Sequence, residues 1–368
     1  MESAPEKAKA ECRMQTRVLN IPYGTKNPYQ NMMYSACEPE FSLAAMKQLN
    51  FAEIAKPEFQ TEHGILHIQW DDRLFPIKDG EDSANNALFQ DAVSGLELYK
   101  SNGGRVIWTI HNRTAHSARE GNDGFHAARR KLAELVDMIH VHTPNARQHM
   151  IAQYDAEPNK ICLIPHPSYL GVYESAEITL ARLMQPRDQT HFLTFGAMRG
   201  NRELDRLHFA IRKLTNRGFD FHMSVVGRVF RPSRRLVRRL DAISNVTVIG
   251  ERVEDEAIPS VFSQAHAYVL PSTQTFTSGT AMLAMTFGLP VVAPDIEPHR
   301  QTTPESCHDL LYPAQNPRGL IRMMMKVMEM SDSELAEKRR ACFEFAQERA
   351  PERISRKLAE ALTVLRNG

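Results

Sequence analysis

A cluster of polar residues in the segment WTIHNRTAH (108–116) could carry out acid–base chemistry. It contains His111, Asn112 and His116, directly after apolar residues that predict a strand. Imidazole accepts protons near neutral pH, so His111 or His116 is a candidate general base, with Asn112 beside the substrate. The chain has 15 His, and a satisfied structural role is the alternative for any one of them. We expect such a structural role for His140, His142 and His149.

The segment HIQWDD (67–72) ends a neighbouring predicted strand and adds further polar groups. Its Trp70 and Asp71 are expected beside the same cleft as the histidines, on the side that receives the acceptor. A carboxylate can also remove a proton, so Asp71 or Asp72 is the next candidate base if neither histidine acts.

Two later loops favour a phosphate-bearing ligand. The loop MRGNRELD follows a predicted strand and contains Arg199 and Arg202, whose guanidinium groups could pair with a diphosphate. The second loop begins an apolar helix with Thr277, Ser278, Gly279 and Thr280. Backbone N–H groups and the helix dipole attract anions at such a start. Solvated arginines and a simple helix N-cap are the alternatives for each loop alone, but together the loops predict a diphosphate site.

Composition and missing motifs exclude several other classes of protein. Lys plus Arg number 45 against 44 Asp plus Glu, so no overall positive field favours nucleic acid. The 5 Cys are scattered without a Cys-x-x-Cys pair, which argues against a disulfide framework or a structural zinc site. No Gly-x-x-x-x-Gly-Lys loop, Gly-x-Gly-x-x-Gly motif, His-Glu-x-x-His helix or Asp-x-Asp triplet occurs. We therefore expect neither a metal ion nor a bound cofactor.

The apolar segments predict the scaffold that positions these loops. Predicted strands alternate with amphipathic helices, which is the pattern of a parallel α/β sheet, and the apolar spacing at 40–55 predicts one of the helices. The alternation stops in a polar link at 173–189 and then restarts, so we predict two doubly wound sheets. Ligands bind beyond the carboxyl ends of strands in such sheets, where the clusters described above fall.

Three segments resemble the GT-B glycosyltransferases, particularly the GT4-like bacterial enzymes of exopolysaccharide assembly. They are TIHN (109–112), FGAMRGNREL (195–204) and PSTQTFTSGTAMLAMTFGLPVVAPD (271–295). The resemblance covers most of the chain and implies an α/β fold of two Rossmann-like domains that face a central cleft. It implies an acceptor-binding domain, a nucleotide-sugar-binding domain and a final helix that crosses back to the first domain, at 1–172, 173–349 and 350–368.

The resemblance also implies a hexosyltransferase that uses a UDP- or GDP-sugar as donor. The acceptor would be a glycan or a lipid-linked oligosaccharide, in exopolysaccharide biosynthesis. Arg199, Arg202 and the helix start at 277–280 would neutralise the leaving diphosphate without a metal ion. His111 or His116 would remove the proton of the acceptor hydroxyl if the enzyme inverts the anomeric centre.

The sequence departs from the family pattern at two positions. Counted back from Gly288, Thr275 and Leu283 stand where the family has glutamates. Those glutamates are associated with sugar and ribose contacts in retaining members, so their loss leaves the stereochemical outcome open. The loss also supports an alternative from another class, a non-catalytic GT-B protein that binds a nucleotide sugar or supports a partner transferase. Bacterial relatives with a TSG-type loop, such as the xanthan-type β-mannosyltransferases, look more similar.

The segment RVFRPSRRLVRRL (228–240) carries six arginines among apolar residues. It is either a solvated helix face or a site of weak attraction to an anionic membrane, at ~1 kcal/mol per basic residue. Residues 1–15 lack the apolar core of a signal peptide, and no run approaches the ~20 apolar residues that span a bilayer. We therefore expect a cytoplasmic protein, with peripheral contact at the inner face of the membrane as an open alternative.

Overall fold

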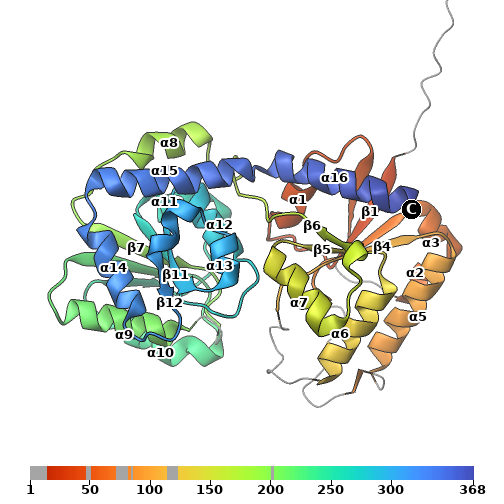
Figure 1. The fold of residues 1–368 in the computed structure, drawn as a ribbon, viewed down its shortest axis with the longest axis horizontal. Helices are drawn as coiled ribbons and strands as arrows, with labels where there is room; N and C mark the ends of the chain where they lie inside the picture. The colour runs from red at the N-terminus through yellow and green to blue at the C-terminus, as the bar shows by residue number, and fades with distance from the viewer. Residues whose placement is uncertain (1–14, 47–50, 72–81, 84–85, 114–122, 200–202) are drawn as a thin grey trace, which may run out of the picture.

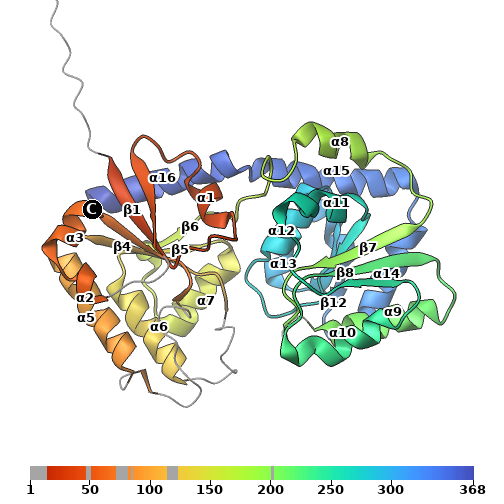
Figure 2. The same ribbon diagram turned by 180° about the vertical axis from the view of Figure 1, so that it is seen from behind.

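The chain folds into two α/β lobes, each built around a parallel β-sheet (Figure 1). The computed structural model describes residues 15–46, 51–71, 82–83, 86–113, 123–199 and 203–368. Helices cover both faces of each sheet (Figures 1 and 2). Two long helices, α15 (Asp332–Glu348) and α16 (Pro351–Asn367), run one after the other along the same side of the two lobes. The two doubly wound α/β units predicted from the alternating pattern are confirmed.

The N-terminal sheet has six strands within the described residues, in the order β2-β1-β3-β4-β5-β6. Their bounds are β1 Thr16–Ile21, β2 Phe41–Ala45, β3 Ile65–Ile68, β4 Arg105–Thr109, β5 Met138–Val141 and β6 Ile161–Leu163. All neighbours pair in parallel. The chain winds in one direction from β1 to β2 and in the other from β3 onward. A crevice therefore opens beyond the carboxyl ends of β1 and β3.

Two helices of this lobe begin at side-chain caps. The side chain of Asn86 accepts a hydrogen bond from Phe89 N at 2.9 Å, and Thr143 caps the helix that begins with Pro144. The helices are α1 Tyr29–Tyr34, α2 Phe51–Ile54, α3 Pro57–Glu62, α5 Ala87–Ser101, α6 Asp123–Leu135 and α7 Pro144–Tyr154.

The predicted helix over 40–55 is wrong in its first part. Phe41–Ala45 forms β2, which pairs in parallel with β1 from Thr16↔Phe41 to Asn20↔Ala45. A short apolar run fits either period, and β1 has backbone N–H and C=O groups on this side that need partners. Pairing with β1 therefore decides the conformation, and the helical part is confined to α2 within the described residues.

The C-terminal sheet also has six strands within the described part of the chain, in the order β12-β11-β10-β7-β8-β9. They are β7 Thr190–Phe195, β8 Phe221–Val226, β9 Val246–Ile249, β10 Ala267–Val269, β11 Val291–Asp295 and β12 Leu311–Pro313. The winding direction reverses between β7 and β10, so the second crevice lies there. The short edge strand β12 was not predicted, because three residues are too few to show a period.

The helices of the C-terminal lobe pack on both faces of its sheet. The predicted polar link contains one of them, α8, and the predicted basic helix is α10 preceded by a short 3-10 turn. The helices are α8 Ala176–Leu183, α9 Leu204–Thr215, α10 Arg234–Asp241, α11 Ile258–Ser263, α12 Gly279–Thr286, α13 Glu297–Gln301 and α14 Gly319–Glu329.

Two long helices at the end of the chain join the lobes. The first, α15 Asp332–Glu348, begins with a capping box between Ser331 and Glu334 and packs on α12. The second, α16 Pro351–Asn367, begins with a proline at its first turn and packs on α1 of the N-terminal lobe. Ser355 Oγ accepts a hydrogen bond from Ala36 N at 2.9 Å. The last helix thus returns to the first lobe.

Neither a disulfide nor a membrane-spanning helix occurs in the described part of the chain. The described cysteines are Cys37, Cys162, Cys307 and Cys342, and none of these four forms a disulfide. Across the described ranges, no helix has the length and apolar character needed to cross a membrane.

Candidate functional site

The polar clusters lie at the two crevices where strand order reverses. In the N-terminal sheet, Trp70 follows β3 and His111 follows β4, next to the reversal between β1 and β3. In the C-terminal sheet, Arg199 follows β7 and residues 277–280 follow β10, on the two sides of the second reversal. Ligands of doubly wound sheets bind at such points, so the clusters are placed for binding.

His111 is half-buried among aromatic and amide groups at the end of β4. The Trp70 ring stacks on it, with centroids 4.8 Å apart and an interplanar angle of 19°. The Tyr29 ring, from α1, meets it edge-on at 4.9 Å. The Nε2 atom of His111 lies 2.9 Å from Oε1 of Gln69. These contacts hold the imidazole in one orientation, as a positioned acid–base group requires.

Asp71 supports the loop after His111 rather than offering a base. Its carboxylate forms a bidentate ion pair with Arg129, at 2.8 and 3.0 Å, and both side chains are buried. Arg129 also donates to the carbonyl oxygens of Asn112 and Arg113, at 3.0 and 3.2 Å. A buried carboxylate that is paired in this way is a poor proton acceptor for a substrate. We therefore expect Asp71 to position the loop after His111 rather than to act as the next candidate base.

Three further histidines occupy structural positions. The carbonyl oxygen of Ile164 accepts hydrogen bonds from both His140 Nε2 and His142 Nδ1, each at 2.9 Å. Burial lowers the pKa of His140 to about 4 and holds the pKa of His142 well below its ordinary value. His149 packs on the ring of Phe276, with centroids 5.0 Å apart, and its pKa is also lowered by burial to about 4. The rings of His140 and His142 are buried in the N-terminal lobe, and His149 is half-buried.

The hydroxyl groups at the start of α12 are engaged within the C-terminal lobe. Ser278 Oγ accepts a hydrogen bond from Ala281 N at 3.2 Å, so Ser278 is the N-cap. The Thr280 hydroxyl lies 2.8 Å from Tyr268 Oη. This geometry matches the simple helix cap that was the alternative. What α12 can offer an anion is its dipole and the backbone N–H groups of its first turn.

Gly279 brings the start of α12 close to residues that lead to the other lobe. A Cβ at this position would lie 3.1 Å from Tyr169 Oη and 3.5 Å from His166 Nε2. The His166 ring packs on Tyr29 with centroids 5.1 Å apart, and Tyr29 also contacts His111. A continuous set of contacts therefore connects α12 with the candidate base. A Gly279→Val change would disturb this packing, so it is not a clean test of ligand binding.

Arg199 belongs to a cluster of cations at the second crevice. Its guanidinium carbon lies 4.9 Å from the centre of the Phe230 ring, and that of Arg228 lies 5.1 Å from the same ring. The segments pair after β7 and β8, where Met198 N donates to Arg228 O at 2.9 Å. Arg228 belongs to the arginine-rich segment 228–240, but it lies before α10, which begins at Arg234. We call Arg199, Phe230 and Arg228 the arginine cluster.

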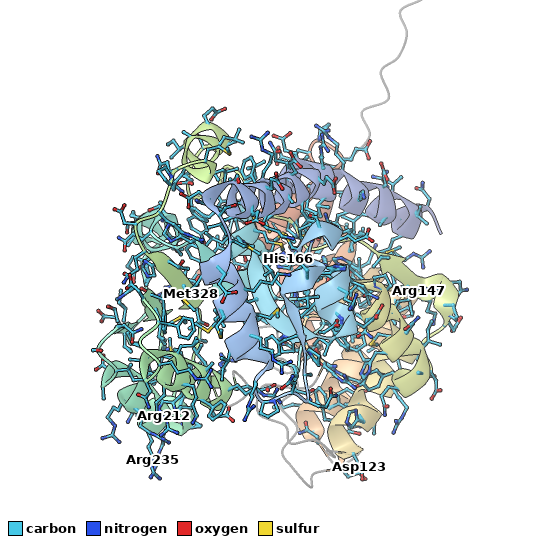
Figure 3. All side chains as sticks on the ribbon, turned by 60° about the vertical axis from the view of Figure 1, so that its left-hand side comes forward. Asp123, Arg147, His166, Arg212, Arg235 and Met328 are labelled. Atoms are coloured by element: carbon cyan, nitrogen blue, oxygen red, sulfur yellow. The ribbon has the colours of Figure 1, made fainter. Side chains whose placement is uncertain are left out.

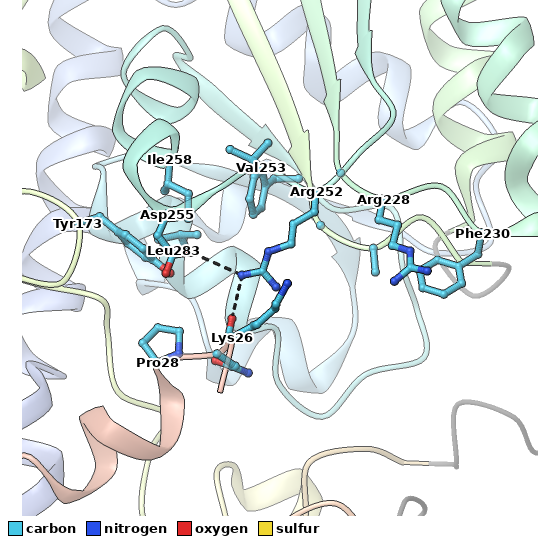
Figure 4. Close-up of a pocket in the computed structure, with 15 residues that line it drawn as sticks. Lys26, Pro28, Tyr173, Arg228, Phe230, Arg252, Val253, Asp255, Ile258 and Leu283 are labelled. Atoms are coloured by element: carbon cyan, nitrogen blue, oxygen red, sulfur yellow. Dashed lines mark hydrogen bonds and ion pairs between the residues drawn. The ribbon is translucent and has the colours of Figure 1, made fainter. Parts of the chain in front are cut away.

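A cavity of about 310 Å³ lies between the lobes beside this cluster (Figure 4). Its walls come from the loops after β7, β8 and β9 and from residues 26–28 of the N-terminal lobe. Arg252 reaches across it, with Nη2 3.2 Å from Lys26 O and 3.7 Å from Asp255 Oδ1. Apolar lining comes from Pro28, Tyr173, Val253, Ile258 and Leu283. An apolar cavity with cations at its rim fits a planar base that carries phosphates.

Gly227 allows two walls of the cavity to approach each other. Its φ of 134° is unfavourable for other residues, and a Cβ there would lie 2.2 Å from Gly196 O. Glycine is therefore required where the ends of β7 and β8 meet.

Some predicted residues lie outside the described part of the chain, namely His116, Arg202 and Asp72. Sequence reasoning missed Lys26, Arg252 and the position of Arg228 in the cavity wall. A signal for two of them existed, because Arg228 and Arg252 follow the ends of β8 and β9, where ligands of such sheets bind.

The structure also describes the two residues that stand where GT-B glycosyltransferases have glutamates. The Thr275 hydroxyl donates to Thr277 O at 2.8 Å, and Leu283 lines the cavity with an apolar side chain. Among the described residues, no group of three or more His, Cys, Asp or Glu is arranged to hold a metal ion.

Comparison with known proteins finds a family model that is similar to part of the C-terminal lobe. Residues 189–330 match the family model described as "Glycosyl transferases group 1". This segment contains the arginine cluster, Arg252 and the start of α12. No curated protein sequence matches the chain significantly.

Solved structures resemble the whole chain at low sequence identity. Sucrose-phosphate synthase from Thermosynechococcus elongatus has a TM-score of 0.70 at 16% identity, over 96% of this chain and 99% of that one. HepE of Anabaena, solved with UDP and glucose, has a TM-score of 0.70 at 12% identity, over 96% and 100%. A glycosyltransferase from Rickettsia africae has a TM-score of 0.68 at 12% identity, over 95% and 98%. The chain therefore has the GT-B fold, and its C-terminal lobe carries the sequence features of the group 1 glycosyl transferases.

Proposed function

We propose that the chain is a glycosyltransferase that moves a hexosyl group from a UDP- or GDP-sugar to a hydroxyl group. The observation that carries the proposal is the arginine cluster beside an interlobe cavity, with the half-buried His111 in the facing lobe. The match of residues 189–330 to the group 1 family supports it, as does the overall similarity to HepE, which was solved with UDP-glucose.

The donor site in this proposal uses the C-terminal lobe. The nucleoside occupies the cavity, with its base against the apolar lining and its diphosphate toward Arg199, Arg228 and the start of α12. Positive charge that is fixed before the reaction stabilises the charge that develops on the leaving diphosphate. Arginines and a helix N-terminus can supply this charge, so we propose that no metal ion is needed.

The acceptor side in this proposal uses His111. The imidazole removes the proton of the acceptor hydroxyl while its oxygen forms a bond to the anomeric carbon of the donor sugar. The bond from that carbon to the diphosphate oxygen breaks, and the nucleoside diphosphate leaves with the electron pair. A single displacement of this kind inverts the anomeric centre. The buried Trp70 ring stacks on His111 and supports the imidazole from one side.

An alternative is a non-catalytic protein that binds a nucleotide sugar or supports a partner transferase. Thr275 and Leu283 favour this alternative, because neither side chain can supply the carboxylate that the family has at its position. Leu283 also faces the cavity with an apolar side chain.

A donor panel tests the proposal. We expect one UDP- or GDP-sugar to raise the melting temperature, because a ligand that binds only the folded state stabilises it. The same donor should release free nucleoside diphosphate slowly in water and faster with a glycan acceptor. Binding of a donor without any release, with or without acceptors, would support the non-catalytic alternative. No binding by any member of the panel would contradict both.

The acceptor in our proposal is a glycan or lipid-linked oligosaccharide of exopolysaccharide assembly, reached at the inner face of a membrane. The exopolysaccharide role rests on the sequence resemblance. Membrane contact is supported by α10, where Arg234, Arg235, Arg238 and Arg239 are exposed while Val237 and Leu240 face the core. Figure 3 shows Arg235 and Arg212 projecting outward from α10 and α9.

A pair of matched variants tests the membrane contact. Arg235→Ala combined with Arg239→Ala should weaken binding to vesicles that contain anionic lipid by about 2 kcal/mol, roughly thirtyfold. The control, Arg353→Ala combined with Lys357→Ala, removes the same charge from exposed positions of α16. Co-sedimentation at two salt concentrations is the measurement. Equal binding of both variants and the wild type would assign α10 to the solvated face.

A further inference from the structure

The tautomer of His111 follows from a chain of three buried amide side chains. These are Gln30 of α1, Asn20 of β1 and Gln69 after β3, all fully buried. The oxygen and nitrogen of an amide cannot be distinguished by shape, so their orientation must be inferred from partners that can only donate or only accept. Two such partners, the N–H of Gly24 and the carbonyl oxygen of Pro22, contact Gln30, the amide most distant from His111 in this series.

The orientation of Gln30 is set by the backbone. Its Oε1 lies 2.7 Å from the N–H of Gly24, which can only donate. Its Nε2 lies 3.3 Å from Pro22 O, which can only accept. The Oε1 of Gln30 is therefore the acceptor, and its Nε2 points to Asn20 Oδ1 at 3.4 Å.

Asn20 passes this orientation on. Its Nδ2 is directed to the carbonyl oxygen of Val18 at 3.5 Å, so its Oδ1 faces Gln30 and Gln69. Gln69 Nε2 donates to that oxygen at 2.8 Å. Its main chain is also fixed, because Gln69 N donates to Ile21 O at 2.8 Å. With its nitrogen turned toward Asn20, Gln69 can present only Oε1 to His111.

We propose that Gln69 is a positioning residue that keeps the proton of His111 on Nε2 and so makes Nδ1 the nitrogen that accepts the substrate proton. Gln69 Oε1 lies 2.9 Å from Nε2, and an oxygen that only accepts requires a protonated nitrogen there. The inference rests on the proposed function for its catalytic part, whereas the tautomer is a property of the free protein. Among the described residues, Tyr29 of α1 and His142, directly after β5, place titratable rings against His111, with centroids 4.9 and 5.8 Å away.

The neutral amide has a chemical consequence. A carboxylate in the place of Gln69 would stabilise the protonated imidazole, whereas an amide orients the ring without adding a full charge. In the transfer step, the O–H bond of the acceptor breaks and Nδ1 gains the proton. The acceptor oxygen forms a bond to the anomeric carbon while the bond from that carbon to the diphosphate oxygen breaks, and the nucleoside diphosphate leaves with the electron pair. The Nε2 proton stays in place and is shared with Gln69.

Nitrogen-15 NMR of histidine-labelled protein tests the tautomer without any substrate. The signal of His111 is identified by its loss in His111→Ala. We expect a proton on Nε2 and none on Nδ1 in the wild type, and a mixture of tautomers in Gln69→Leu. Gln153→Leu, at an exposed position of α7 in the same lobe, is the control and should leave the signals unchanged. A proton on Nδ1 of the wild type, or the same tautomer in Gln69→Leu, would overturn the proposal.

Kinetics then separate this inference from the proposed function. Gln69→Leu should lower kcat by about tenfold or more, and by less than loss of His111, with donor KM unchanged. Gln69→Glu retains an acceptor for Nε2, so it should keep the tautomer and move the acid limb of the rate profile to higher pH. The expected tautomer in a protein that transfers no sugar would contradict the proposed function and leave the orientation by Gln69 standing. An unchanged kcat in Gln69→Leu of an active enzyme would overturn the positioning role.

Discussion

Replacement of His111 by alanine is expected to lower the rate of sugar transfer by about 100- to 10,000-fold, the usual contribution of a general base. The affinity for the donor should stay near that of the wild type, because His111 lies in the N-terminal lobe and the arginine cluster lies in the other. Steady-state kinetics with saturating donor and calorimetric titration with the nucleoside diphosphate measure the two quantities separately.

The matched control for this experiment is His308→Ala, since His308 lies in the C-terminal lobe, in the 3-10 turn at Glu305–Leu310. It should retain the wild-type rate. If His111→Ala keeps most activity and His116→Ala does not, the role of base belongs to His116. If both histidine variants stay active, a general-base mechanism that uses this loop is wrong. Asp71 would then not be the first alternative, because its carboxylate is paired with Arg129.

Removal of either arginine of the cluster is expected to weaken binding of the nucleoside diphosphate. Arg199→Ala and Arg228→Ala should each cost ~1.5–3 kcal/mol, the range for hydrogen bonds to charged groups, or about 10- to 150-fold in Kd. Arg202→Ala is expected to act in the same way. Titration calorimetry of the folded variants with UDP and with GDP is the measurement.

A charge control separates direct contact from a general field effect. Arg217→Ala removes one positive charge at an exposed position just beyond the end of α9, and we expect an unchanged Kd. The loss of affinity in Arg199→Ala and Arg228→Ala should also be smaller for the nucleoside, because the nucleoside lacks the diphosphate. Equal Kd values for the wild type and both cluster variants would assign these arginines to packing on Phe230 alone.

The sequence was informative about the site where a local pattern was enough. The ends of predicted strands pointed to His111 and Arg199, because parallel strands present their carboxyl ends at one edge of a sheet. The start of α12 was recognised from Ser278 and Gly279, since an N-cap depends only on neighbouring residues. Those two residues do not reveal whether the helix start binds an anion or only caps the helix. In the structure, the hydroxyl groups of Ser278 and Thr280 form hydrogen bonds within the C-terminal lobe.

Residues distant in the sequence escaped prediction for one physical reason. Arg228 joins Arg199 only through the pairing of segments after β7 and β8, and Lys26 reaches Arg252 only where the two lobes meet. From the sequence, Asp71 is a candidate base, and its ion pair with Arg129, 58 positions later, forms only in the folded chain. Contacts of this kind have no periodic signature, because they depend on how elements pack.

The amino-acid sequence by itself determined the alternating elements, the two doubly wound sheets and the edge of each sheet at which His111 and Arg199 lie. These features depend on apolar periodicity and on turn and cap residues, which act over a few neighbouring positions. The tertiary structure alone decided that 41–45 is a strand, that Asp71 is paired, and that Gln30, Asn20 and Gln69 orient His111. Each of these depends on a backbone or side-chain partner from another element, and only the folded chain brings that partner within hydrogen-bonding distance.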